Sequence, residues 1–213
     1  MARKASEERR ATIIEAAAQA LARDGITETT TRKIAAAAHV NQAMIGYYFG
    51  SKDELLYAVL QEMMRRTAEI ASEALPSGVG FDAGLAQAVE AFWRHVEESP
   101  ELQIMQYELT LYAMRNPAAA WLAREQYAGY CAVVEALFTE ASAASGQTCA
   151  ISCAELARFV VGGLDGLILQ FLSDRDSMRA RRDLGNLIGA VTALAEGTAT
   201  PTHVAPPGEG EAR

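Results

Sequence analysis

The side chains best suited to chemistry gather between residues 29 and 52, which read TTTRKIAAAAHVNQAMIGYYFGSK. Hydroxyls, amides, phenols and cations in such a mixture bind phosphates and the edges of bases, because they exchange hydrogen bonds with both. The amide of Asn41 or Gln42 can make two hydrogen bonds to adenine or reach a phosphate. We therefore expect this stretch to recognise nucleic acid.

The rest of the chain offers little for catalysis or metal binding. It has no phosphate-binding glycine loop, no nucleophile with a base at motif spacing, and three histidines. Its cysteines, Cys131, Cys149 and Cys153, are odd in number, which argues against a disulfide framework. No histidine lies near them, so we expect small buried or half-buried thiols. The sequence predicts neither an enzyme nor a bound metal or cofactor.

Charge is divided unevenly along the chain. The first 52 residues hold eight Lys or Arg and five Asp or Glu, a net charge of +3, whereas residues 53–213 carry −11. A basic end on an acidic body concentrates the attraction for phosphate at one end. Chance clustering would give the same totals, and so would a helical scaffold whose basic end meets an acidic protein.

Helical periodicity covers nearly the whole chain, without convincing strand alternation, so the expected fold class is all-α. Nine helices are expected, at residues 7–24, 32–38, 41–47, 51–75, 82–98, 100–115, 117–144, 152–172 and 176–195. Gly25 suits the left-handed residue that ends a helix. Ser51 and Ser152 each open a capping box with the glutamate three residues later.

The first three helices are short, and a tight turn at His39 joins the second to the third, as in a helix-turn-helix. A helix-turn-helix domain, residues 1–50, is therefore expected before a larger helical domain, residues 51–196, and a disordered tail, residues 197–213. The N-terminus lacks the apolar core of a signal peptide, and charged or amide side chains interrupt every apolar run before about 18 residues. We expect a cytoplasmic protein without a membrane partner.

Residues 9 to about 60 resemble the TetR family of bacterial transcriptional regulators. The shared pattern consists of the threonines, an Ile-Ala pair, a short connection, an aromatic cluster and a helix that starts Ser-Lys-x-Glu-Leu. The later helices match the family in number, length and acidity. The resemblance implies nine helices, of which the fourth joins the helix-turn-helix domain to a bundle that dimerises. It also implies a repressor that binds a palindromic operator in double-stranded DNA as a homodimer and is released by a small molecule.

The resemblance assigns DNA contacts to nine residues: Thr30, Thr31, Arg32, Asn41, Gln42, Ala43, Tyr47, Tyr48 and Lys52. Among these, Tyr48 and Lys52 could instead be merely solvated. Gly46 departs from the family's pattern, since many members have a tyrosine there, and His39 stands where the turn usually has glycine. We expect His39 to adopt a left-handed conformation and Phe49 to seal the small domain.

Aromatic and polar side chains are mixed on the central helices, where the resemblance implies a small-molecule site. The candidates are Trp93, Tyr107, Glu108, Tyr112, Trp121, Tyr127 and Tyr130. Periodicity cannot separate a pocket from a packed core, so each of them could be a core residue. They predict an apolar or aromatic effector, and Glu108, a carboxylate in an apolar stretch, adds the option of a cationic group.

The last two helices are too apolar for the surface of a monomer. Residues 154–172 are apolar around the whole helix and include Gly162, Gly163 and Gly166, which allow close approach of another helix within the core or across a dimer. The resemblance favours a dimer, with these candidates: Leu164, Ile168, Phe171, Leu184, Leu187, Ile188 and Val191. The alternative is a helical scaffold or ligand-binding protein that does not bind DNA.

Overall fold

A computed structural model of the chain describes residues 2–73, 81–146 and 148–202. These residues form nine α-helices and no strand, which confirms the all-α class. The helices are α1 Ala2–Glu28, α2 Thr31–Ala37, α3 Gln42–Phe49, α4 Lys52–Glu73, α5 Phe81–Glu98, α6 Pro100–Arg115, α7 Ala120–Ser145, α8 Cys153–Asp174 and α9 Ser177–Glu196.

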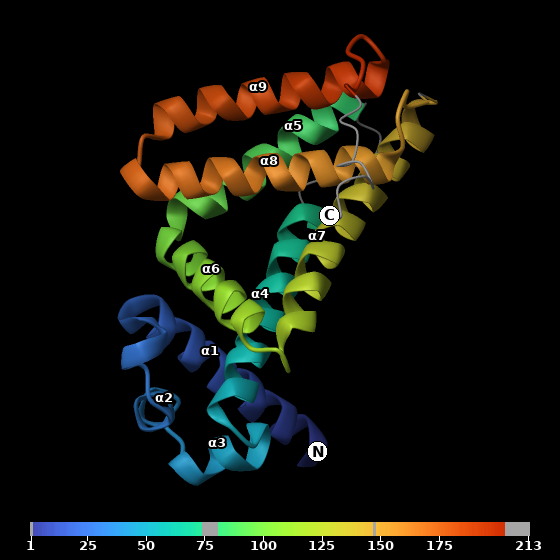
Figure 1. Cartoon of the computed structure of the whole chain (residues 1–213). Coiled ribbons are helices and arrows are strands. Elements are labelled where there is room, and N and C mark those ends of the chain that lie inside the picture. The colour runs from blue at the N-terminus through green and yellow to red at the C-terminus, as the bar shows by residue number, and fades with distance from the viewer. Residues whose placement is uncertain (1, 74–80, 147, 203–213) are drawn as a thin grey trace, which may run out of the picture.

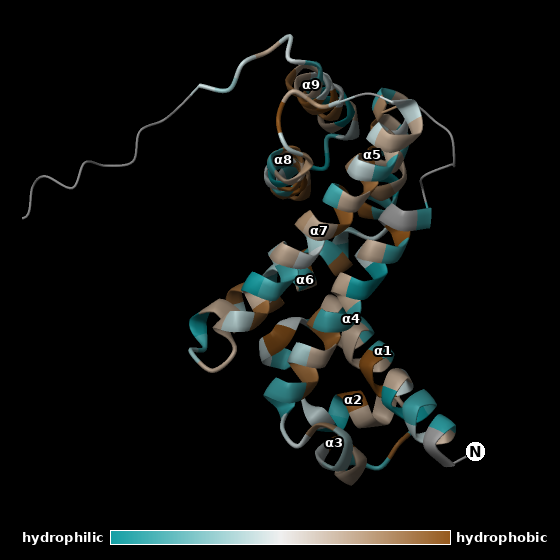
Figure 2. Cartoon of the chain, turned by 90° about the vertical axis from the view of Figure 1, so that its right-hand side faces the viewer, coloured by the Kyte–Doolittle hydropathy of each residue, from teal (hydrophilic) through white to brown (hydrophobic). Residues whose placement is uncertain are grey.

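The helices are arranged along one long direction. Figure 1 shows α1 to α3 and the start of α4 at one end, with α8 and α9 together at the other. The view in Figure 2, turned by 90°, shows the same order, with α4, α5, α6 and α7 between the two ends. Because α4 begins beside α3 and continues into the middle of the molecule, it physically connects the two ends.

Two apolar clusters hold this arrangement. The first joins α1, α2, α3 and α4 to α6, and includes the buried Ile13, Ile34 and Leu109. The second joins α5, α7, α8 and α9 around Trp93 and Val191, which are both fully buried. The first cluster crosses the boundary expected at residues 50–51, because α4 and α6 both pack against α1.

Local signals in the sequence account for most helix ends. Gly25 has φ 73°, so regular helical geometry breaks there as expected, although the helix assignment continues to Glu28. Ser152 makes both hydrogen bonds of its capping box with Glu155. Ser51 accepts a hydrogen bond from the Glu54 backbone N–H at 3.1 Å.

Other helix ends differ from the expectation. α1 starts at Ala2, five residues early, because the polar N-terminal residues continue its helical backbone, and α7 starts at Ala120 rather than at residue 117. Asn116 explains the later start of α7, since its side chain accepts a hydrogen bond from the Ala118 N–H and holds a turn. The expected end of α4 at residue 75 and most of the expected tail, residues 203–213, lie outside the described residues.

The expectation that charged or amide side chains interrupt every apolar run does not hold for α8. Among the described helices, α8 alone is long and apolar enough, by length and composition, to cross a membrane. Its apolar side chains have another use: Leu156, Val160 and Ile168 lie in the second cluster and pack against α5, α7 and α9.

Candidate nucleic-acid interface and ligand cavity

The turn between α2 and α3 is built by its own side chains. The Thr30 hydroxyl caps α2 by accepting from the Lys33 N–H at 3.2 Å, and the Asn41 side chain caps α3 by accepting from the Ala43 N–H at 2.9 Å. His39 has φ 54°, which confirms the left-handed conformation expected of it. Asn41 thus uses its side-chain oxygen as a cap and keeps its NH₂ group for other contacts.

One face of α2 and α3 is open to solvent. Its exposed members among the predicted contacts are Thr30, Arg32, Asn41, Gln42, Ala43 and Tyr47. The Gln42 side-chain NH₂ donates to the Thr31 hydroxyl at 3.0 Å, which ties the starts of the two helices together. Tyr47 is 80% exposed, a large cost for an aromatic ring unless a partner covers it.

Tyr48 and Lys52 are half-buried, so neither is merely solvated. The rings of Tyr47 and Tyr48 meet edge to face at 5.1 Å, and the Lys52 ammonium donates to the Ile26 carbonyl at 2.9 Å. Lys52 therefore braces the end of α1 with one N–H and retains two more donors. Phe49 is buried, as expected, and Arg10, absent from the predicted site, lies 5.1 Å from its ring centroid.

A cavity of about 100 Å³ lies among α4, α5, α6, α7 and α8; we call it the central cavity. Most of its lining is apolar, from Phe81 and Phe92 of α5 to Phe138 of α7. Thr67 and Ala68 place α4 in its wall, and α8 contributes Val160, Val161, Leu164, Asp165 and Ile168. The same helix that begins at Lys52 in the helix-turn-helix end thus touches this cavity.

The predicted pocket residues divide into those at the cavity and those elsewhere. Tyr130 lines it, and Tyr107 and Tyr127 lie behind the wall, where both interact with Asp165. Trp93 belongs instead to the core, fully buried with its ring 5.5 Å from Phe171.

Glu108, Tyr112 and Trp121 are corrections. Glu108 is exposed on the opposite side of α6, with its carboxylate beside Gly25 of α1. Tyr112 and Trp121 lie near the start of α4, where the Tyr112 hydroxyl donates to Asp53 at 3.0 Å and Trp121 borders a polar cleft. A mixed helix surface in the sequence does not reveal which of its sides faces the cavity.

Asp165 is a site residue that the sequence analysis missed. Tyr107 donates its hydroxyl to the Asp165 carboxylate at 3.2 Å and lies 3.3 Å from its backbone carbonyl. Burial raises the pKa of Asp165, while the hydroxyls of Tyr127 and Tyr107 act in the opposite direction. Burial and the nearby Asp165 likewise raise the pKa values of Tyr107 and Tyr127. The signal in the sequence was a single acid within the apolar run of α8.

Several predicted dimer residues are committed inside the subunit. Ile168, Phe171, Leu184 and Val191 are buried in the second cluster, and Leu164 lines the cavity. Leu187 fills the space beside Gly163, where a Cβ would lie 2.6 Å from its Cδ1. These side chains therefore cannot form most of a contact with another copy, although Ile188 remains half-buried.

A different face of α8 and α9 is open. Phe159, Leu169 and Met178 are exposed apolar side chains on it. Four glycines have open space where a Cβ would stand: Gly162, Gly166, Gly185 and Gly189. We call these seven residues the α8–α9 face.

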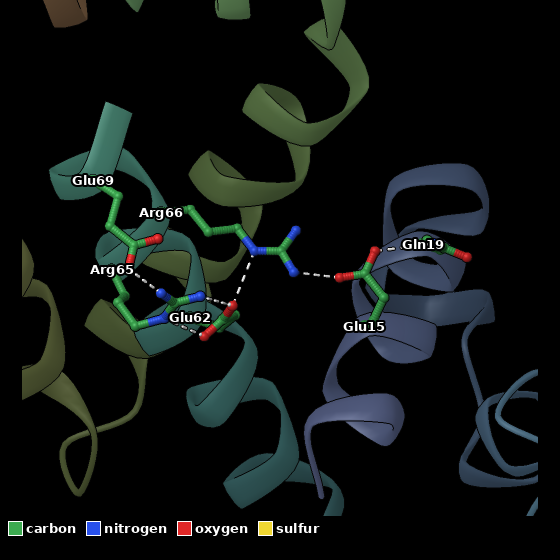
Figure 3. A network of polar contacts seen from close by, with 6 residues as sticks. All are labelled: Glu15, Gln19, Glu62, Arg65, Arg66 and Glu69. Atoms are coloured by element: carbon green, nitrogen blue, oxygen red, sulfur yellow. Dashed lines mark hydrogen bonds and ion pairs between the residues drawn. The ribbon is translucent and has the colours of Figure 1, made fainter. Parts of the chain in front are cut away.

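Polar contacts connect α4 to the helix-turn-helix end. Figure 3 shows Arg66 of α4 between Glu62, to which its Nε donates at 2.9 Å, and Glu15 of α1, with which it forms an ion pair. Hydrogen bonds from Arg65, and then from Arg66, lower the pKa of Glu62 to about 2. Since Thr67 follows Arg66 directly and lines the central cavity, one turn of α4 contacts both α1 and the cavity.

Comparisons with known proteins agree with this architecture. Residues 13–59 match the family model of bacterial regulatory proteins of the tetR family, and residues 80–194 match that of the tetracyclin repressor-like C-terminal domain. The chain is 29% identical over 184 residues to the nicotine-responsive transcriptional repressor HdnoR of Paenarthrobacter nicotinovorans, covering 86% of this chain and 93% of that protein. It is 27% identical over 165 residues to the regulator BetI of Burkholderia thailandensis, covering 66% and 85%.

Solved structures place the fold in the same group. GusR of Salmonella enterica is 26% identical with a TM-score of 0.69, covering 89% of this chain and 96% of that one. The multidrug binding protein EbrR, complexed with imidazole, is 25% identical with a TM-score of 0.62, covering 92% and 93%. With an exposed helix-turn-helix, a helical body and family models matched at both, the chain belongs to the TetR family of bacterial transcriptional regulators.

Proposed function

We propose that the protein represses transcription by binding a palindromic operator as a homodimer, and that a small molecule in the central cavity releases it. The observation that carries this proposal is the course of α4, which starts beside the recognition helix at Lys52 and lines the cavity at Thr67. A ligand that moves α4 would move the helix-turn-helix with it. Such a protein would work in the cytoplasm, where its operator is.

The exposed face of α2 and α3 would meet the DNA. The capped start of α3 carries Asn41 and Gln42, whose amides would reach base edges, and Tyr47 would cover its ring against the DNA backbone. Arg32 and Thr30 at the start of α2 would contact phosphate, since cations and hydroxyls position a protein on the duplex. Lys52 would add a phosphate contact through the N–H groups that Ile26 leaves free.

The α8–α9 face would join two subunits. Exposed apolar side chains and four unobstructed glycines favour close helix contact between copies. Two recognition helices on a two-fold axis would read half-sites about 34 Å apart. A dimer therefore supplies the affinity that a single short helix lacks.

The effector would be small and largely apolar. The lining of the central cavity supports this, and so does the name of the nicotine-responsive relative, since nicotine is a small heterocyclic compound. A hundredfold loss of operator affinity needs about 2.7 kcal/mol of difference between the two states, which one ligand can supply.

Fluorescence anisotropy with a labelled duplex from the region beside the protein's own gene tests the proposal. We expect binding that falls steeply with salt, and release by compounds that bind saturably. The matched variant is Ala88→Phe, which fills the cavity from α5 and should keep operator binding while losing the response. Equal affinity for operator and scrambled duplex would overturn the DNA-binding roles, and an unchanged response in Ala88→Phe would overturn the ligand site.

A further inference from the structure

We propose that Asp165 makes the central cavity select an organic cation, an apolar molecule that carries a protonated amine, over neutral molecules of the same shape. This inference rests on the proposed function, because it takes the central cavity as the ligand site. It adds the chemical class of the ligand and the residue that chooses it.

The first argument is the composition of the cavity wall. Among the described residues that line the cavity, Asp165 carries the charge, whereas its neighbours on α8 are Val161, Leu164 and Ile168. A carboxylate in such surroundings is costly unless a cation or several donors compensate it. No described Lys, Arg or His forms an ion pair with Asp165. The protein therefore leaves this charge for something that enters the cavity.

The second argument is the unused hydrogen-bonding capacity of the carboxylate. An ionised carboxylate offers about four acceptor sites, and the hydroxyls of Tyr107 and Tyr127 can each fill one. Those two phenols hold Asp165 in place and stabilise its ionised form, since both lower its pKa against the effect of burial. The remaining sites can accept the N–H of a ligand ammonium.

The third argument is the set of groups around Asp165. The rings of Tyr127 and Tyr130 meet edge to face at 6.3 Å, and Tyr130 lines the cavity beside Asp165. Aromatic faces attract a desolvated cation. Gln103 and Gln106 of α6 are buried and line the same cavity, and their side-chain amides have no hydrogen-bond partner among the described residues. They can orient a second polar group of the ligand.

The test uses two compounds that differ in charge alone. Benzyldimethylamine is protonated at neutral pH, and isobutylbenzene has the same shape with a C–H in place of the N–H. Their affinities for the full-length protein are measured by calorimetry. An apolar cavity without a counter-ion would reject the ammonium, because the charge loses its hydration. We therefore expect the wild type to bind benzyldimethylamine more tightly than isobutylbenzene.

Asp165→Asn keeps the size of the side chain and removes the charge. We expect it to lower the affinity for benzyldimethylamine by about tenfold or more, as for the loss of one charge-assisted contact, and to leave that for isobutylbenzene within about threefold. Glu108→Gln is the matched control, because it removes a carboxylate that lies on α6 outside the cavity, and it should change neither affinity.

The outcomes separate the inference from the proposed function. If isobutylbenzene binds in the cavity and benzyldimethylamine binds equally well to the wild type and Asp165→Asn, the charge selection is wrong and the ligand site stands. If neither compound binds, or Ala88→Phe leaves both affinities unchanged, the cavity is not the ligand site and both proposals fall. If Asp165→Asn does not fold, a wild type that prefers isobutylbenzene overturns the inference by itself.

Discussion

At the scale of single residues, the helix-turn-helix separates side chains that brace the fold from those left for DNA. Lys52 holds the end of α1 through the Ile26 carbonyl, and Thr31 receives the Gln42 amide. Arg32, by contrast, is exposed and forms no ion pair among the described residues. Arg32 is therefore a cleaner test of a phosphate contact than Lys52, whose removal would also loosen α1.

Replacing Arg32 by Ala should weaken binding to every DNA sequence and reduce the salt slope by about one unit, because one phosphate contact is lost. Replacing Gln42 by Ala should instead relax preference at particular base pairs, by about 1–3 kcal/mol at each. Anisotropy against operator and point-substituted duplexes at several salt concentrations measures both effects. Arg124→Ala removes an exposed cation of α7 and should leave both unchanged.

Local side-chain chemistry was readable from the sequence, whereas contacts between distant residues were not. The Asn41 cap, the left-handed His39 and the buried Phe49 depend on neighbours a few residues away. Asp165 depends on Tyr107, which is 58 residues away, and nothing in the spacing indicates that pairing. The sequence thus predicted a cationic option for the ligand but attached it to Glu108, which lies on the wrong side of α6.

At the scale of helices, glycines in α8 have two different environments. Gly163 packs against α9, where an added Cβ would lie 2.6 Å, 2.9 Å and 3.3 Å from three atoms of Leu187. Gly162 and Gly166 on the same helix have open space at that position. The sequence predicted close approach of another helix, within the core or across a dimer, and Gly163 makes the first of these contacts.

Gly163→Ala should destabilise the protein by about 1 kcal/mol or more, since the whole Leu187 side chain must move and the gain in helix propensity is smaller than the strain. Gly129→Ala in α7 is the control, because its Cβ would meet the flexible end of Met64 at an ordinary 3.8 Å. That variant should gain about 0.5–1 kcal/mol. Urea unfolding measures both, and equal behaviour of the two variants would contradict the packing argument.

The Arg66–Glu15 ion pair gives the connection between α4 and α1 a testable form. Both side chains are partly exposed, so the pair is worth at most about 1 kcal/mol. If it carries ligand-induced movement, Glu15→Gln should reduce the loss of operator affinity on ligand binding by up to about fivefold. Glu69→Gln, which breaks a contact within α4, should leave that loss unchanged. A full response in Glu15→Gln would assign the coupling to the apolar contacts of α1 with α4 and α6.

At the scale of the whole molecule, the two ends make different demands on the sequence. The helix-turn-helix end was predicted well because capping and turn residues locate its short helices. The α8–α9 end was predicted as helices, but the assignment of their faces was reversed in part, since Phe171, Leu184 and Val191 are core residues of one subunit. A helix that is apolar all round gives no sign of which stripe the subunit uses and which it leaves for a second copy.

The dimer prediction follows from the stripe that the subunit leaves open. Leu169 is exposed on α8 beside the unobstructed Gly162 and Gly166, so Leu169→Glu would place a charge in the contact between two copies. The same change at Leu187, by contrast, would disrupt the subunit itself. Leu111→Glu is the control, because Leu111 is an equally exposed leucine on α6, away from the α8–α9 face.

We expect wild type and Leu111→Glu to have twice the 22.9 kDa mass of one chain by light scattering at micromolar concentration, and Leu169→Glu to have the mass of one chain. Operator affinity should fall by about 10²-fold or more in Leu169→Glu, because a single recognition helix loses the second half-site. Its circular dichroism should remain helical, since no subunit contact is removed. A monomeric wild type, or a Leu169→Glu variant that stays dimeric, would place the interface on another surface.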